Sequence, residues 1–178
     1  MTSRFALVLV LAATVAIASA VSGPCSALQI AGTKTKYNLT PLEGKSYSAV
    51  STNGGTYTFN WGVCSNIPCG GGGTTGVCQT MQGGPGGPVS VAPFNPNKVV
   101  VIPVKGGLGP GIGIQYQDPN FGRIANIFVL CDKNAKEATG FKVNFSPGSL
   151  SETDLILSHV SGCGIQKKLS AGSIMLIV

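Results

Sequence analysis

Short runs of alternating apolar and polar residues, separated by turn formers, limit what this chain can fold into more than any other feature. An apolar residue at every second position is typical of a β-strand with one buried face. Glycine and proline, 26 and 11 of the 178 residues, gather between the runs and predict turns there. We therefore expect an all-β sandwich or barrel, with no helix beyond one turn at 135–138. The predicted strands are 57–63, 89–91, 98–104, 112–116, 124–130, 141–145 and 155–160.

The N-terminus has the three parts of a secretory signal peptide. Met1–Arg4 carries one positive charge, Phe5–Ala18 is apolar throughout, and Ala18-Ser19-Ala20 is a cleavage site of small residues. The apolar stretch is shorter than the roughly 20 residues of a membrane span, although a retained signal anchor is an alternative. We expect residues 1–20 to be a signal peptide and residues 21–166 to form a domain inside the secretory pathway.

All six cysteines lie in that mature part of the chain. An even number of cysteines in an oxidising compartment predicts three disulfides, but six cysteines allow fifteen pairings. A zinc site is disfavoured because no two cysteines are spaced as CxxC and the only histidine, His159, is expected to be structural. The cysteines are Cys25, Cys64, Cys69, Cys78, Cys131 and Cys163.

Charge and motifs argue against nucleic-acid binding and against catalysis. The 12 basic residues outnumber the 6 acidic ones, but no basic run exceeds two residues. No serine stands in a GxSxG elbow, and no cofactor motif is present. Glycosidic chemistry needs a pair of acids, and we expect the few available here to be surface and turn residues. Those acids are Asp132, Glu137, Glu152 and Asp154.

Two sequons predict N-glycosylation, which fits the same compartment. Asn38 begins the sequon Asn38-Leu39-Thr40 in a polar stretch that we expect to be exposed. Asn144 begins the sequon Asn144-Phe145-Ser146, and Pro147 after it makes Asn144 the poorer acceptor.

The C-terminal segment departs from the alternating pattern. Residues 169–178 are uncharged and mostly apolar. One interpretation is a final buried strand. We favour the other, in which residues 167–178 begin a transmembrane helix that continues beyond the given sequence, because ten helical residues span only about half of a bilayer core.

Several segments between Cys25 and Cys163 form a series whose order and spacing are similar to those of a known family. They are 37–47, 57–64, 76–79, 112–116 and 127–132, closed by Cys163. The series resembles the mannose 6-phosphate receptor homology (MRH) domain. The resemblance implies a flattened β-barrel of two antiparallel sheets. It also implies the disulfide pairs Cys25–Cys64, Cys69–Cys78 and Cys131–Cys163.

Sugar-binding members of that family hold the mannose ring with a glutamine, an arginine, a glutamate and a tyrosine. By resemblance the glutamine is Gln79, which follows Cys78, and the arginine is Arg123. The other two positions, counted back from Cys163, are Ile156 and Ser161. Glu152 or Asp154 could replace the glutamate only if the register of the strand shifts, and a shift of one residue would also reverse the faces of the strand.

Two functions therefore follow from the resemblance. In the first, this is the lumenal domain of a receptor-like type I membrane protein of the Golgi, endosome or lysosome that binds mannose or mannose 6-phosphate glycans on glycoproteins. Two missing ring contacts, each contributing about 1.5–3 kcal/mol, predict millimolar or no affinity. In the second, the domain binds no sugar and acts in protein–protein interaction or membrane trafficking.

Overall fold

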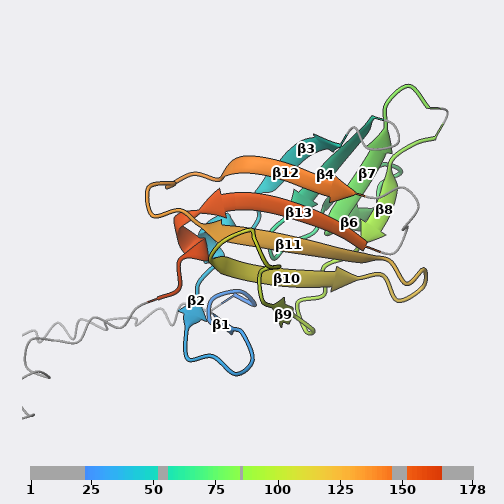
Figure 1. The fold of residues 1–178 in the computed structure, drawn as a ribbon. Helices are drawn as coiled ribbons and strands as arrows, with labels where there is room; N and C mark the ends of the chain where they lie inside the picture. The colour runs from blue at the N-terminus through green and yellow to red at the C-terminus, as the bar shows by residue number, and fades with distance from the viewer. Residues whose placement is uncertain (1–22, 52–55, 85, 146–151, 166–178) are drawn as a thin grey trace, which may run out of the picture.

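Two large β-sheets that lie face to face form the body of the fold, as the computed structural model shows (Figure 1). The structure describes residues 23–51, 56–84, 86–145 and 152–165. In spatial order the larger sheet contains β12 (Thr139–Phe145), β13 (Glu152–His159), β11 (Ile124–Cys131), β10 (Gly111–Gln117) and β9 (Val100–Ile102). The smaller sheet contains β3 (Ser46–Ser51), β4 (Tyr57–Gly62), β7 (Val77–Met81) and β8 (Val89–Ala92).

The core lies between the two sheets and is built from the alternating residues. In β4 the side chains of Phe59 and Trp61 are fully buried, as their spacing predicts. Leu155 and Leu157 of β13 face them from the larger sheet. At one side the sandwich closes where β12 lies against β3, and the rings of Phe141 and Tyr47 stack there with centroids 5.6 Å apart.

One strand pair departs from the expected antiparallel arrangement. β11 and β13 run parallel, with Ile124 opposite Glu152 and Cys131 opposite His159. After β11 the chain forms β12 at the edge of the sheet, leaving room for one strand between them. It then returns as β13, which fills the position between β11 and β12. β12 runs opposite to β11, so β13, which is antiparallel to its hairpin partner β12, runs parallel to β11.

Three disulfides join the pairs that the family resemblance implies: Cys25–Cys64, Cys69–Cys78 and Cys131–Cys163. The first connects the N-terminal segment to the end of the smaller sheet, and both of its cysteines are buried. That N-terminal segment forms a two-stranded sheet of β1 (Leu28–Gln29) and β2 (Lys36–Tyr37), followed by the 3-10 helix η1 (Thr40–Leu42). The second joins Cys69, at the end of β5 (Ile67–Pro68), to Cys78 in β7, and β5 pairs with β6 (Thr74–Thr75) in a small hairpin between these cysteines.

The helical turn expected at 135–138 is wrong. Ala135 instead accepts a hydrogen bond from the backbone N–H of Val160, and the carbonyl of Lys136 lies 2.8 Å from Nε2 of His159. His159 is buried, and its Nδ1 accepts from the backbone N–H of Ser161 at the start of the 3-10 helix η2 (Val160–Gly162). This histidine therefore fastens a loop to the end of β13, which is a structural role.

Two expected segments lie outside the described residues: the signal peptide at 1–20 and the apolar tail at 167–178. Within the part of the chain that the structure describes, no helix has both the length and the apolar character to cross a bilayer.

Candidate functional site

Gln79 and Arg123, far apart in the sequence, line the same pocket of about 270 Å³. Gln79 lies in β7 of the smaller sheet, and Arg123 directly precedes β11 of the larger one. The pocket thus spans the seam between the sheets. Its remaining lining residues are Tyr57, Met81, Gly86, Gly87, Val89, Val91 and Thr153.

Arg123 is oriented by contacts on both sides of its guanidinium group. Its Nη1 donates a hydrogen bond to the carbonyl of Ser90 in β8 at 3.1 Å. On the other side, the guanidinium carbon lies 5.3 Å from the centre of the Phe121 ring. A guanidinium group has five N–H donors. Among the described residues only the bond to Ser90 uses them, so most remain available to a ligand.

The turn between β10 and β11 fixes the backbone of Arg123. The carbonyl of Arg123 accepts from the backbone N–H of Asp118 at 2.8 Å. The buried side chain of Asp118 accepts from the N–H groups of Asn120 and Phe121, which holds the turn closed. Gly122 completes it with a φ of 64°, a conformation that glycine adopts without steric cost.

Gln79 is positioned by β7 and by the disulfide beside it. It pairs with Phe59 of β4 on one side and with Val89 of β8 on the other. The preceding residue, Cys78, is buried and bonded to Cys69, which ties β7 to the glycine-rich loop at 70–73. The side chain of Gln79 is half-buried.

Neither of the other two positions carried over from the family lies at this pocket. Ile156 pairs with Phe128 and is buried on the face of β13 away from the core, whereas Thr153 lines the pocket. Ser161 lies in η2, which follows the opposite end of β13. None of the described residues that line the pocket is acidic.

Tyr57 lines the pocket, although the family resemblance of the sequence did not point to it. The resemblance pointed to a tyrosine near Cys163, but Tyr57 reaches the pocket from β4. The alternation of apolar and polar residues in 57–63 could have indicated Tyr57, because it lies two residues before Phe59 and so shares its face of the strand. Gln79, Arg123 and Tyr57 supply three of the four side-chain types that the family uses.

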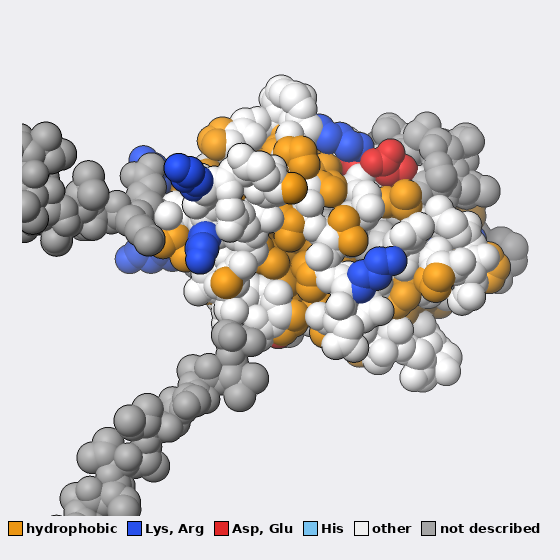
Figure 2. Space-filling model, turned by 90° about the horizontal axis from the view of Figure 1, so that it is seen from below, with side chains coloured by type: hydrophobic (Ala, Val, Ile, Leu, Met, Phe, Trp, Pro, Cys, Tyr) orange, Lys and Arg blue, Asp and Glu red, His pale blue; other side chains and the backbone are white. Residues whose placement is uncertain are grey.

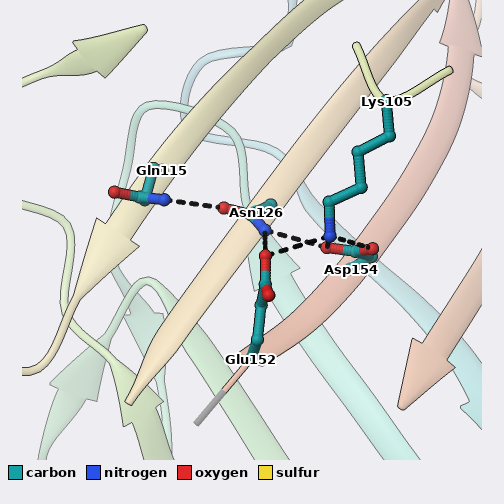
Figure 3. Close-up of polar contacts among 5 residues, drawn as sticks. All are labelled: Lys105, Gln115, Asn126, Glu152 and Asp154. Carbon is teal, nitrogen blue, oxygen red and sulfur yellow. Dashed lines mark hydrogen bonds and ion pairs between the residues drawn. The ribbon is translucent and has the colours of Figure 1, made fainter. Parts of the chain in front are cut away.

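Glu152 and Asp154 lie outside the pocket, in a polar cluster on the outer face of the larger sheet (Figure 3). The Nζ of Lys105 contacts a carboxylate oxygen of Glu152 at 2.9 Å and one of Asp154 at 2.8 Å. Asn126 donates to both carboxylates and accepts from Nε2 of Gln115 at 3.1 Å. These contacts hold the start of β13, next to the pocket residue Thr153, against Lys105 and Asn126.

The ion pairs of this cluster shift the pKa of two of its members. Hydrogen bonds from Lys105 first, and then from Asn126, lower the pKa of Glu152 below its usual 4.5. Partial burial opposes the charge of Lys105. Its hydrogen bonds to Asp154 and Glu152 outweigh that effect and raise its pKa.

Acid is therefore expected to leave this cluster intact down to about pH 5. A carboxyl group with a lowered folded-state pKa contributes stability above its unfolded pKa and loses it as the pH falls through the folded one. The stability difference between the wild type and Glu152→Gln should stay constant from about pH 7 to 5 and shrink below about pH 4. Urea denaturation at each pH measures it.

Glu137→Gln is the matched control for this prediction. Glu137 meets Lys45 at 3.6 Å, but its side chain is 84% exposed, so solvent screens the pair. This variant should differ little from the wild type at any pH. A Glu152→Gln effect that disappears between pH 7 and 5 would contradict the expectation.

The two predicted glycosylation sites are both exposed asparagines. Asn38 precedes η1, and its Oδ1 accepts from the backbone N–H of Thr40 at 3.0 Å. Asn144 lies in β12, the edge strand of the larger sheet, while Ser146 and Pro147 lie outside the described residues.

The comparisons identify a fold. No protein-family profile matches the chain, and no curated protein does. Among solved structures it is similar to chicken IGF2R domain 11, an MRH repeat, with a TM-score of 0.50 and 11% identity over 80% of this chain and 93% of that one. The chain has an MRH-like fold. In this MRH-like domain the described residues contain no group of three or more side chains that could hold a metal ion.

Proposed function

We propose that this MRH-like domain is the lumenal, ligand-binding part of a receptor-like membrane protein of the secretory and endolysosomal route. Its ligands are mannose-type glycans, plain or 6-phosphorylated, on glycoprotein cargo. The observation that supports the proposal is the meeting of Gln79 and Arg123 in one pocket. In this proposal residues 1–20 are cleaved, Asn38 and Asn144 carry glycans, and the segment 167–178 begins the membrane anchor.

The pocket offers the groups that a sugar ring needs. Ring hydroxyls donate and accept hydrogen bonds, so the amide of Gln79 and the guanidinium of Arg123 both suit them. Tyr57 and Thr153 also line the pocket, and each carries a hydroxyl group of the kind that bonds a sugar ring. The described residues that line the pocket include no pair of acids, which glycosidic chemistry would need.

The missing carboxylate sets the expected strength of binding. A charged hydrogen bond contributes about 1.5–3 kcal/mol, which corresponds to roughly tenfold or more in affinity. With no acid to accept from the ring hydroxyls, the domain should bind a single mannose at millimolar concentration. Avidity between several domains and a branched glycan would be needed for tight cargo capture.

The second candidate function is recognition of a protein without a sugar, and the apolar part of the pocket favours it. Met81 and Val89 are each 45% exposed and line the pocket beside Arg123. Methionine and arginine are enriched in protein interfaces. In this case the same pocket would contact a side-chain cluster of a partner protein.

Arg123→Ala is expected to abolish measurable glycan binding. The variant removes the one charged donor among the described lining residues and should weaken binding by about tenfold or more. Calorimetric titration of the protein from a secretory host, with high-mannose glycan and with mannose 6-phosphate, measures the change. Lys98→Ala is the matched control, because this exposed lysine lies at a different pocket and should leave binding unchanged. No binding by the wild type with all three disulfides formed would refute the glycan proposal and favour the protein ligand.

A further inference from the structure

A second pocket, of about 220 Å³, lies beside the edge of the larger sheet, where the chain enters β9 alongside β10. Figure 2 looks from below Figure 1 and shows apolar side chains gathered along the middle of this face, with basic side chains beside them. The described residues that line this pocket all differ from those at Gln79 and Arg123. Its lining residues are Pro93, Phe94, Asn95, Lys98, Val99, Val100, Gln115, Tyr116, Gln117 and Pro119.

The edge of β10 is open at this pocket. β9 pairs with β10 only from Gly113 to Gln115, and Gln115 meets Val100 as the last pair. Continuing the ladder would place Val99 and Lys98 opposite Tyr116 and Gln117, but both precede the start of β9. The end of β10 therefore has no strand beside it on this side in the described structure.

The backbone groups of Gln117 point toward that open edge. The N–H of Asp118 bonds the carbonyl of Arg123, and the N–H of Cys131 bonds the carbonyl of Pro110. In an antiparallel ladder alternate residues bond the same neighbour, so the even-numbered residues of β10 bond β11. Gln115 and Gln117 consequently direct their backbone groups to the opposite side, where β9 covers Gln115 but not Gln117.

The apolar wall of the pocket is held in place by the protein itself. The amide of Asn66 accepts from the backbone N–H of Phe94 at 2.8 Å and donates to its carbonyl at 3.0 Å. The ring of Phe94 packs against that of Tyr116, with centroids 5.2 Å apart. A wall fixed in this way loses little entropy when a ligand binds.

Among the described residues that line the pocket, Lys98 alone carries a charge. Lys98 is exposed, so its ammonium group could form an ion pair with a carboxylate of a partner bound along the open edge of β10. Strand addition to an exposed sheet edge uses backbone hydrogen bonds for affinity and side-chain pockets for specificity. An extended peptide with an apolar side chain and a carboxylate would match the open edge of β10, the apolar wall and the charge of Lys98.

We propose that this pocket binds an extended peptide segment of another protein. The peptide pairs its backbone with Gln117, places one apolar side chain against Phe94 and Val99, and directs a carboxylate to Lys98. This function goes beyond glycan binding at Gln79 and Arg123 and does not depend on it.

The test begins with a phage-displayed library of random 12-residue peptides, selected on the purified full chain. We expect enriched peptides in which an apolar residue is followed closely by an acidic one. A synthetic peptide of the enriched sequence should bind Lys98→Glu about tenfold or more weakly than the wild type and Arg123→Ala equally well. Amide NMR shifts on binding should be largest at 115–117.

Three outcomes would overturn the proposal. The first is no enrichment over the uncoated support. The second is a peptide that binds Lys98→Glu as tightly as the wild type. The third is a set of NMR shifts centred on Gln79 and Arg123, which would instead assign peptide binding to the other pocket. Glycan titration of Lys98→Glu separates this test from that of the glycan proposal, because its sugar binding should be unchanged.

Discussion

Replacing both cysteines of the Cys25–Cys64 disulfide with alanine is expected to lower the free energy of unfolding by about 4 kcal/mol. The two residues are 39 positions apart, so the disulfide removes much of the chain entropy of the unfolded state. Both cysteines are buried in the core, where the smaller alanine side chains leave space unfilled. Since small domains have about 5–15 kcal/mol of stability, this variant should be close to unfolding at body temperature.

The Cys69–Cys78 disulfide provides the matched comparison. Its cysteines are only 9 positions apart, and the loop-entropy relation gives about 2.7 kcal/mol for closing it. Urea denaturation of the two double-alanine variants should therefore rank Cys25–Cys64 as the more stabilising. The reverse order would show that loop entropy does not control the stability of this fold.

Tyr116→Phe is expected to lower the free energy of unfolding by roughly 2–4 kcal/mol. The hydroxyl group of Tyr116 is buried, accepts from the backbone N–H of Cys64 at 2.7 Å and donates to the carbonyl of Gly62 at 3.0 Å. It thus links β10 to the end of β4. Phenylalanine fills the same space but leaves both backbone groups buried without their partner.

Tyr47→Phe is the control that isolates the hydrogen bonds of Tyr116. The hydroxyl group of Tyr47 is buried and has no hydrogen-bond partner in the described structure. Burial, with a smaller effect from Glu137, raises its pKa to about 12. Removing this hydroxyl should be neutral or stabilising. Equal losses from Tyr116→Phe and Tyr47→Phe would contradict the role assigned to Tyr116, and thermal unfolding measures both.

The alternation of residues gave the positions of most strands because apolar side chains occupy one face. It did not reveal β3 (Ser46–Ser51), because two of its three inward positions hold the small residues Ala49 and Ser51, while the apolar Val50 faces solvent. It also could not give the parallel pairing of β11 with β13. That pairing depends on the order in which three strands fill the sheet, which no local pattern encodes.

The candidate site was predicted in part for a similar reason. Gln79 and Arg123 could be placed because each adjoins a local landmark: Gln79 follows Cys78, and Arg123 precedes the strand that ends at Cys131. The two positions counted back from Cys163, Ile156 and Ser161, do not line the pocket. The register of β13 turns Glu152, Asp154 and Ile156 to the outer face and leaves Thr153 to line the pocket.

Titration of the isotope-labelled protein with methyl mannoside, followed by NMR, tests the central claim most directly. The account predicts fast-exchange shifts that saturate at millimolar sugar and centre on Gln79, Arg123 and Tyr57. The amide signals of the second pocket, around Gln117, should not shift. Shifts that avoid Gln79 and Arg123, or no shifts at all in protein with its three disulfides formed, would contradict the account.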